Sequence, residues 1–156
     1  MGTRGVLAIV AALAVALPVA GCGGGGGESS SGPTISKAVF IRKADAICKQ
    51  SIERIEKSFV VYLSKSGGGL HPGKANEEEL VGKVLVPSVK REVKELRALG
   101  APSGDEDRVD AIVEALEEGV ETAESNPKAV TNSSEVVFGI ASRLAKEYGL
   151  EVCGSR

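Results

Sequence analysis

The chain has 156 residues, with 19 basic and 21 acidic side chains, two tyrosines, three phenylalanines and no tryptophan. The resulting net charge of −2 excludes a strongly basic nucleic-acid-binding protein. The scarcity of aromatic side chains also excludes the stacking platforms on which single-stranded nucleic acids bind.

Residues 1–21 have the pattern of a signal peptide. Arg4 precedes an uncharged apolar run, residues 6–19, which is shorter than the roughly 20 residues that span a bilayer but suits a signal-peptide core. The run ends in Val-Ala-Gly-Cys at 19–22, where small residues followed by cysteine resemble the lipobox of bacterial lipoproteins. We therefore expect a lipid on Cys22 that anchors the protein to the extracytoplasmic face of the cell membrane. An ordinary secretory signal that happens to precede a cysteine is the alternative.

Residues 22–33 are rich in glycine and serine, and this composition predicts a flexible tether with a maximum reach of about 38 Å. Removal of residues 1–21, whose only charged residue is Arg4, leaves 18 basic against 21 acidic residues and a net charge of −3. The remaining residues, 34–156, are enough for one folded domain with its own hydrophobic core.

The first helix is predicted over residues 35–65. Apolar side chains recur there at intervals of three and four, as on one face of a helix, and Thr34 or Ser36 can serve as the N-cap. Three consecutive glycines at 67–69 end it. The side chains expected to face inward are Phe40, Ala44, Ile47, Cys48, Ile52, Ile55, Phe59, Tyr62 and Leu63.

The second helix is predicted to begin at Asn76, which forms a capping box with Glu79, and to end at Leu99. Pro87 lies in its middle. Because proline lacks an N–H and its ring crowds the preceding turn, we expect a kink or break near Val86. The side chains expected to face inward are Leu80, Val81, Val84, Leu85, Val89, Val93, Leu96 and Leu99.

The third helix is predicted to follow a second capping box, Ser103 with Glu106, and to run to about Glu124, before Pro127. Its apolar positions form one continuous seam, so we expect this face to lie in the core. The seam comprises Val109, Ile112, Val113, Leu116, Val120 and Ala123.

The fourth helix is predicted to begin near residues 132–134 and to end at Tyr148, because Gly149-Leu150 has the form of a glycine C-cap and its closing hydrophobic residue. Four amphipathic helices joined by short connections predict an all-α domain, a single antiparallel four-helix bundle with a kinked second helix. The inward side chains of the fourth helix are Val136, Val137, Ile140, Ala141, Leu144, Ala145 and Tyr148.

The three cysteines predict one disulfide. Lipidation of Cys22 would leave Cys48 and Cys153 in an oxidising compartment, where such pairs bridge. The bridge would close a loop of about 105 residues and contribute up to about 4.7 kcal/mol in the chain-entropy model. A metal or redox-active site is the alternative, but the sequence has neither a Cys-x-x-Cys motif nor a histidine near these cysteines.

Five acidic residues follow a 4-3-4-3 spacing along the third helix, each one position after a residue of its apolar seam. One position is 100° on a helix, so the carboxylates form a row beside the core face. Like charges four residues apart repel, and the row therefore needs cationic partners. These are either lysines and arginines of the first two helices, or a divalent cation or basic protein. The row, called the acidic ladder below, comprises Asp110, Glu114, Glu117, Glu121 and Glu124; the internal candidates are Lys49, Lys57, Lys83, Lys90, Arg91, Lys94 and Arg97.

No catalytic constellation is recognisable. The only histidine, His71, stands beside a proline in a glycine-rich stretch without a partnering nucleophile. Residues 68–74 have the spacing of a phosphate-binding loop, but Ala75 replaces the hydroxyl residue that binds magnesium. We expect no enzymatic activity, no cofactor, no metal and no nucleotide.

Three short motifs resemble one family. The residues Ala-Asp-Ala-Ile-Cys at 44–48, Tyr-Gly-Leu-Glu-Val-Cys-Gly at 148–154 and Ala-Pro-Ser-Gly-Asp-Glu at 101–106 are similar to those of small uncharacterised actinobacterial lipoproteins. The resemblance implies a membrane-attached helical domain with Cys48 and Cys153 paired. It implies no activity.

Two functions remain open for such a domain. The first is a non-enzymatic interaction domain that engages an envelope protein or cell-wall partner. The second is a carrier or sensor that binds a small ligand or a cation. An apolar cavity of several hundred Å³ between the helices would favour the second, and a filled core would favour the first.

Overall fold

The computed structural model describes residues 35–65 and 74–155, and all regular secondary structure within these ranges is helical. Helix α1 spans Lys37–Lys65. It begins directly after Ser36, one of the two predicted N-caps. Ser36 acts as the cap because its Oγ accepts a hydrogen bond from the Val39 N–H at 3.4 Å. The other predicted cap, Thr34, lies outside the described residues. In α1, Phe40, Ala44 and Cys48 are fully buried.

The second predicted helix is continuous but irregular. It consists of α2 (Lys74–Leu80), a π-helical segment (Val81–Leu85) and α3 (Val86–Leu99). The expected irregularity near Val86 is thus a π turn, in which the Val86 N–H donates to the Val81 carbonyl. Pro87 accounts for it, because proline has no N–H and disturbs the regular bonds of the preceding turn. The predicted start at Asn76 is wrong, since α2 already begins at Lys74.

Helix α4 spans Glu106–Ser125, and all six residues of its predicted seam are buried. Asp105 is the N-cap, but its carboxylate does not bind the N–H groups of the helix. Instead, the Gly104 N–H donates to Glu106 Oε2 at 2.6 Å. The predicted capping box between Ser103 and Glu106 is therefore wrong, because Asp105 is the N-cap and Glu106 binds the Gly104 N–H.

A short helix that the sequence did not predict, α5 (Pro127–Asn132), follows α4 directly. Pro127 does end α4, as expected, but it also occupies the first turn of α5. The first N–H groups of a helix have no partner within it, so a proline there removes no bond.

Helix α6 spans Ser134–Tyr148, and both of its predicted ends are confirmed. Ser133 Oγ accepts a hydrogen bond from the Val136 N–H at 3.3 Å. Gly149 adopts φ 105°, and the buried Leu150 donates its N–H to the Ala145 carbonyl. A 3₁₀ turn, Cys153–Ser155, completes the described chain.

The inward orientation predicted for Val136 and Ile140 is wrong. These side chains are 79% and 53% exposed, whereas Ala141, Ala145 and Tyr148 of the same helix are buried. The apolar stripe of α6 is wider than the surface that its neighbours cover, because α6 packs mainly on α4.

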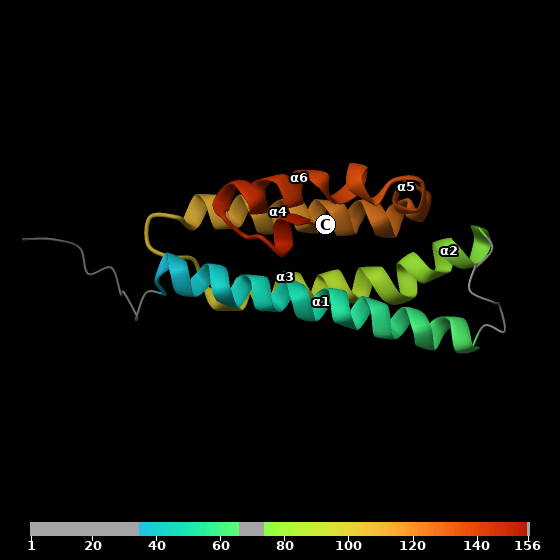
Figure 1. The fold of residues 1–156 in the computed structure, drawn as a ribbon. Helices are drawn as coiled ribbons and strands as arrows, with labels where there is room; N and C mark the ends of the chain where they lie inside the picture. Colours follow the sequence, from blue (N-terminus) through green and yellow to red (C-terminus); the bar gives the residue numbers. More distant parts are fainter. Residues whose placement is uncertain (1–34, 66–73, 156) are drawn as a thin grey trace, which may run out of the picture. The chain divides into compact units, whose positions relative to one another are not determined.

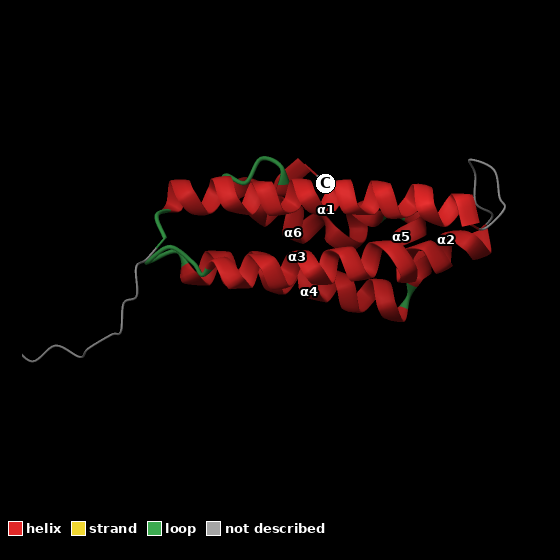
Figure 2. Cartoon of the chain, turned by 90° about the horizontal axis from the view of Figure 1, so that it is seen from below, coloured by secondary structure: helices red, strands yellow, loops and turns green. Residues whose placement is uncertain are grey.

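The long helices run in alternating directions, with α1 and α3 lying together and α4 and α6 lying together (Figure 1). The closest packing is α1 on α3, α3 on α4 and α4 on α6, and α3 lies between α1 and α4 in the view from below (Figure 2). Within the described part of the chain, α1 and α6 have few close backbone approaches. They meet at one end, where the Phe40 and Tyr148 rings lie edge to face with their centres 5.8 Å apart. Away from that end, the helical bundle is open between its first and last long helices.

Candidate functional site

The acidic ladder lies along α4 beside α3, and two of its carboxylates are paired with cations of α3. Arg97 donates two hydrogen bonds to Glu117, at 2.9 and 2.7 Å, and Lys90 donates one to Glu124 at 2.7 Å. The bonded guanidinium lowers the pKa of Glu117 below its usual value. Internal pairing, one of the two explanations for the ladder, therefore holds for these two residues.

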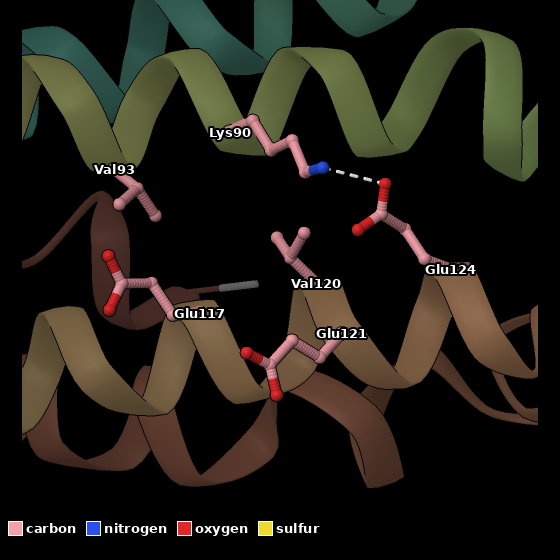
Figure 3. A pocket seen from close by; sticks show the side chains of 6 residues that line it. All are labelled: Lys90, Val93, Glu117, Val120, Glu121 and Glu124. Atoms are coloured by element: carbon pink, nitrogen blue, oxygen red, sulfur yellow. Dashed lines mark hydrogen bonds and ion pairs between the residues drawn. The ribbon is translucent and has the colours of Figure 1, made fainter.

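The rest of the ladder is less tightly paired. The hydrogen bond to Glu117 is the main cause that raises the pKa of Arg97. The negative charges of Asp110 and Glu114 raise it to a smaller extent. Glu121 points away from Lys90 in the shallow hollow of about 320 Å³ between α3 and α4 (Figure 3). No cluster of three metal-ligating side chains is found in the described ranges. Two other expected partners, Lys83 and Arg91, instead bind acids four residues away along the same continuous helix, Glu79 and Glu95.

The disulfide between Cys48 and Cys153 is present and joins α1 to the 3₁₀ turn after α6, with the two Cα atoms 5.3 Å apart. Both cysteines are buried. Glu92 of α3 is fully buried beside them, with its Oε1 3.5 Å from Cys48 Sγ. A sulfur pair this enclosed is out of reach of a redox partner in the folded protein, so its role is structural.

Asp45 reinforces the same junction. Its carboxylate accepts three backbone N–H bonds, from Glu151 at 3.1 Å, Val152 at 2.9 Å and Cys153 at 3.2 Å. Three donors on one carboxylate form a charge-assisted clasp that holds the end of the chain on α1. No sequence pattern predicted this clasp, although Asp45 lies three residues before Cys48 and within one of the family-like motifs.

A second polar junction joins the start of α4 to the end of α6. The Tyr148 hydroxyl donates to Asp105 Oδ2 at 2.9 Å, and Lys37 Nζ lies 3.3 Å from the same carboxylate. Lys37 and Arg108 also lie over the Tyr148 ring, at 4.2 and 5.1 Å from its centre. Burial and the neighbouring carboxylate raise the pKa of Tyr148 to about 12, and the tyrosine hydrogen bond lowers the pKa of Asp105.

The hollow that best fits a ligand is the α1–α6 cleft, a cavity of about 240 Å³ at the open edge of the bundle. Val89 and Leu116 are buried at its floor. Its walls are formed by four half-buried side chains and by the exposed Ser134. No charged residue lines it, whereas the other hollows described here, at the surface, all include lysine, arginine or acidic side chains. The lining comprises Ile55, Leu85, Val89, Leu116, Ser134, Phe138 and Ser142.

Gly119 determines where the Phe138 wall of the cleft stands. A Cβ added to Gly119 would lie 2.5 Å from Phe138 Cδ1, which is closer than side chains approach in proteins. The absence of a side chain on α4 therefore lets the phenyl ring lie against that helix, so that the space beside it stays open. Neither Gly119 nor Phe138 was predicted from the sequence to be a site residue.

Several predicted features lie outside the described residues, among them Cys22, the tether at 22–33, His71 and the glycine-rich stretch around it. Among the described helices, none combines the length and the apolar character that a membrane crossing needs. Comparison with protein families, curated proteins and solved structures finds no match to this chain. The functional proposal therefore depends on the geometry of the cleft and on the sequence signals at the N-terminus.

Proposed function

We propose that the protein is a membrane-anchored extracytoplasmic lipoprotein whose helical domain is a carrier or sensor that binds a small ligand in the α1–α6 cleft. The observation that carries this proposal is the apolar cavity between α1 and α6, whose backbones approach closely at few positions. Small-molecule sites are typically concave, mostly apolar and equipped with a few polar groups, and the two serines of the lining match that description. The topology that we propose is an antiparallel four-helix bundle left open along one edge.

A non-enzymatic role fits this site, because the lining of the cleft contains no titratable side chain that could transfer a proton or attack a substrate. The buried cysteines contribute to stability instead. The resemblance to small actinobacterial lipoproteins is consistent with an anchored helical domain.

The anchoring part of the proposal rests on the lipobox ending at Cys22. Two or more acyl chains would hold the protein stably at the membrane, since each buried CH₂ contributes about 0.8 kcal/mol. Cys22→Ala should therefore release the protein from the membrane fraction or leave the precursor uncut. Cys153→Ala is the matched control and should remain anchored. Unchanged processing and partitioning of Cys22→Ala would contradict the anchor.

The ligand-binding part is tested with a library of small charged and uncharged compounds, using the thermal unfolding of the full-length protein as readout. Ser142→Phe places a ring in the cleft, and Ser64→Phe places the same ring on the exposed end of α1. A compound that stabilises the wild type and the Ser64→Phe control, but not Ser142→Phe, would support binding in the cleft. If no compound distinguishes the two variants, the cleft is not a binding site.

The second candidate function, a protein-interaction domain, is favoured by one observation. Val136 and Ile140 are exposed on α6 one turn apart, and exposed apolar side chains in such proximity are typical of a contact surface. Val136→Lys with Ile140→Lys should then abolish a cross-link that the wild-type protein forms in intact membranes. The fold should be unaffected, because neither side chain is buried.

A further inference from the structure

The α1–α6 cleft is bounded on four sides. Ile55 belongs to α1, Leu85 and Val89 to the π segment and α3, Leu116 to α4, and Phe138 to α6. Val89 and Leu116 are only 3% and 5% exposed, so the floor is part of the hydrophobic core. Two hydroxyl groups, described below, complete the lining. A molecule bound in this space would therefore lose its contact with water over most of its surface.

The absence of charge in the lining restricts the ligand. Moving an ion out of water without a partner costs several kcal/mol even after the protein relaxes. Glu92, the one buried acid among the described residues, does not line the cleft and instead lies against Cys48. A carboxylate or an ammonium group would find no counter-charge there, so the cleft should discriminate strongly against ionised molecules.

The volume restricts the ligand further. A dry apolar cavity of about 150 Å³ holds one benzene molecule, so a cavity of about 240 Å³ corresponds to roughly ten non-hydrogen atoms. Ser134, Phe138 and Ser142 follow one another at intervals of four residues along α6, and this stripe extends over about 12 Å. The space therefore suits an elongated molecule with a ring or short chain.

The two serines supply polarity without charge. Within helices, serine and threonine hydroxyls commonly bond the carbonyl one turn back. Ser88 and Thr122 do this, at 2.7 and 2.9 Å. Among the described residues, neither the Ser134 nor the Ser142 hydroxyl has a hydrogen-bond partner. Both hydroxyls can thus bind a group of the ligand.

From these observations we infer the ligand class, an inference that rests on the proposed function: the cleft binds uncharged apolar molecules of about ten non-hydrogen atoms that carry one hydroxyl or carbonyl group. The apolar part lies on Val89, Leu116 and Phe138. The polar group bonds to Ser134 or Ser142 near the solvent side.

A set of compounds with one carbon skeleton tests the inference. 2-Phenylethanol is neutral, phenylacetate is anionic and 2-phenylethylamine is cationic at pH 7, while ethylbenzene lacks the polar group. Binding to the full-length protein is measured by calorimetry for the wild type and for the Ser142→Phe and Ser64→Phe variants. We expect 2-phenylethanol to bind at least tenfold more tightly than either ion, and only when the cleft is unblocked.

The hydroxyl contribution is measured with Ser134→Ala combined with Ser142→Ala. A hydrogen bond of ordinary strength predicts that this variant binds 2-phenylethanol about two- to tenfold more weakly, with ethylbenzene unchanged. Circular dichroism of each variant checks that the helices are intact. If Ser142→Phe does not fold, Ser142→Leu replaces it as the blocked variant.

The outcomes separate the two proposals. Binding of the ions as tight as that of the alcohol, lost on blocking the cleft, would overturn the ligand class but leave the cleft as a binding site. Binding of no compound, or binding equally strong in the blocked variant, would overturn both. Equal weakening of the alcohol and of ethylbenzene by the serine substitutions would exclude the hydroxyl groups as ligand contacts.

Discussion

Removal of the disulfide should have the largest effect on stability of any change that leaves the core packing nearly intact. The perturbation is Cys48→Ala combined with Cys153→Ala, so that no free thiol remains. The two residues are 105 positions apart. A loop of that length corresponds to about 16 cal/mol/K of chain entropy in the unfolded state, or about 4.7 kcal/mol at 25 °C. Domains of this size are stable by about 5–15 kcal/mol, so the variant should be marginally stable.

The assay is equilibrium unfolding in urea followed by circular dichroism, on wild type and variant under identical conditions. The slope of the unfolding free energy against urea should rise in the variant, because an unlinked chain exposes more surface when it unfolds. A loss of less than about 1 kcal/mol with an unchanged slope would refute the reasoning, since the cross-link would then not restrict the unfolded chain.

Reduction of the wild-type protein is an independent check that needs no substitution. Both cysteines are buried, at 0% and 3% exposure, so a thiol reagent reaches them only after the end of the chain has opened. The disulfide should therefore resist dithiothreitol in native buffer and become reducible as urea is added. Rapid reduction under native conditions would show that the end of the chain detaches easily from α1.

Three further changes test the junctions and the cleft. Asp45→Ala removes three charge-assisted bonds at a half-buried site and should lower the unfolding free energy by about 2–3 kcal/mol in urea titrations, with Asp45→Asn as the isosteric comparison. Gly119→Ala should lower the unfolding free energy by about 1–3 kcal/mol through overpacking, and it should weaken ligand binding. Adding Phe138→Ala should relieve the clash, and a double-mutant cycle would detect this relief as coupling between the two positions. The Tyr148 hydroxyl lowers the pKa of Asp105 in the folded state, so the contribution of this carboxylate to stability is present above about pH 4 and is lost as the pH falls below that value. Asp105→Asn should therefore reduce the loss of stability in acid, as measured by unfolding at a series of pH values. An unchanged loss in acid would contradict the assignment.

Local signals in the sequence predicted the helix boundaries where the cap is made by adjacent residues. Ser36, Ser133 and the Gly149-Leu150 pair each act within one turn of the helix they cap, and all three were predicted correctly. The seam of α4 was also predicted in full, because a narrow apolar stripe leaves only one face that can lie in the core.

The features that decide the candidate site depend on contacts distant in sequence. Asp45 meets its donors more than 100 residues further along the chain, and no local pattern indicates that pairing. The apolar stripe of α6 is wide, so periodicity could not tell that Ile140 would be exposed while Ala141 is buried. The cleft lies where α1 and α6 separate beyond the contact between Phe40 and Tyr148, and only the packing of the whole domain determines that separation.

The cross-link between Cys48 and Cys153 also affects what happens when the chain is cut. Hydrolysis of any peptide bond between these positions yields two fragments that remain covalently joined, since the bridge encloses that entire part of the sequence. A nicked molecule would therefore migrate as one species on a non-reducing gel and as two only after reduction. If the N-terminal fragment is held in a membrane, the C-terminal fragment would be retained there with it rather than shed.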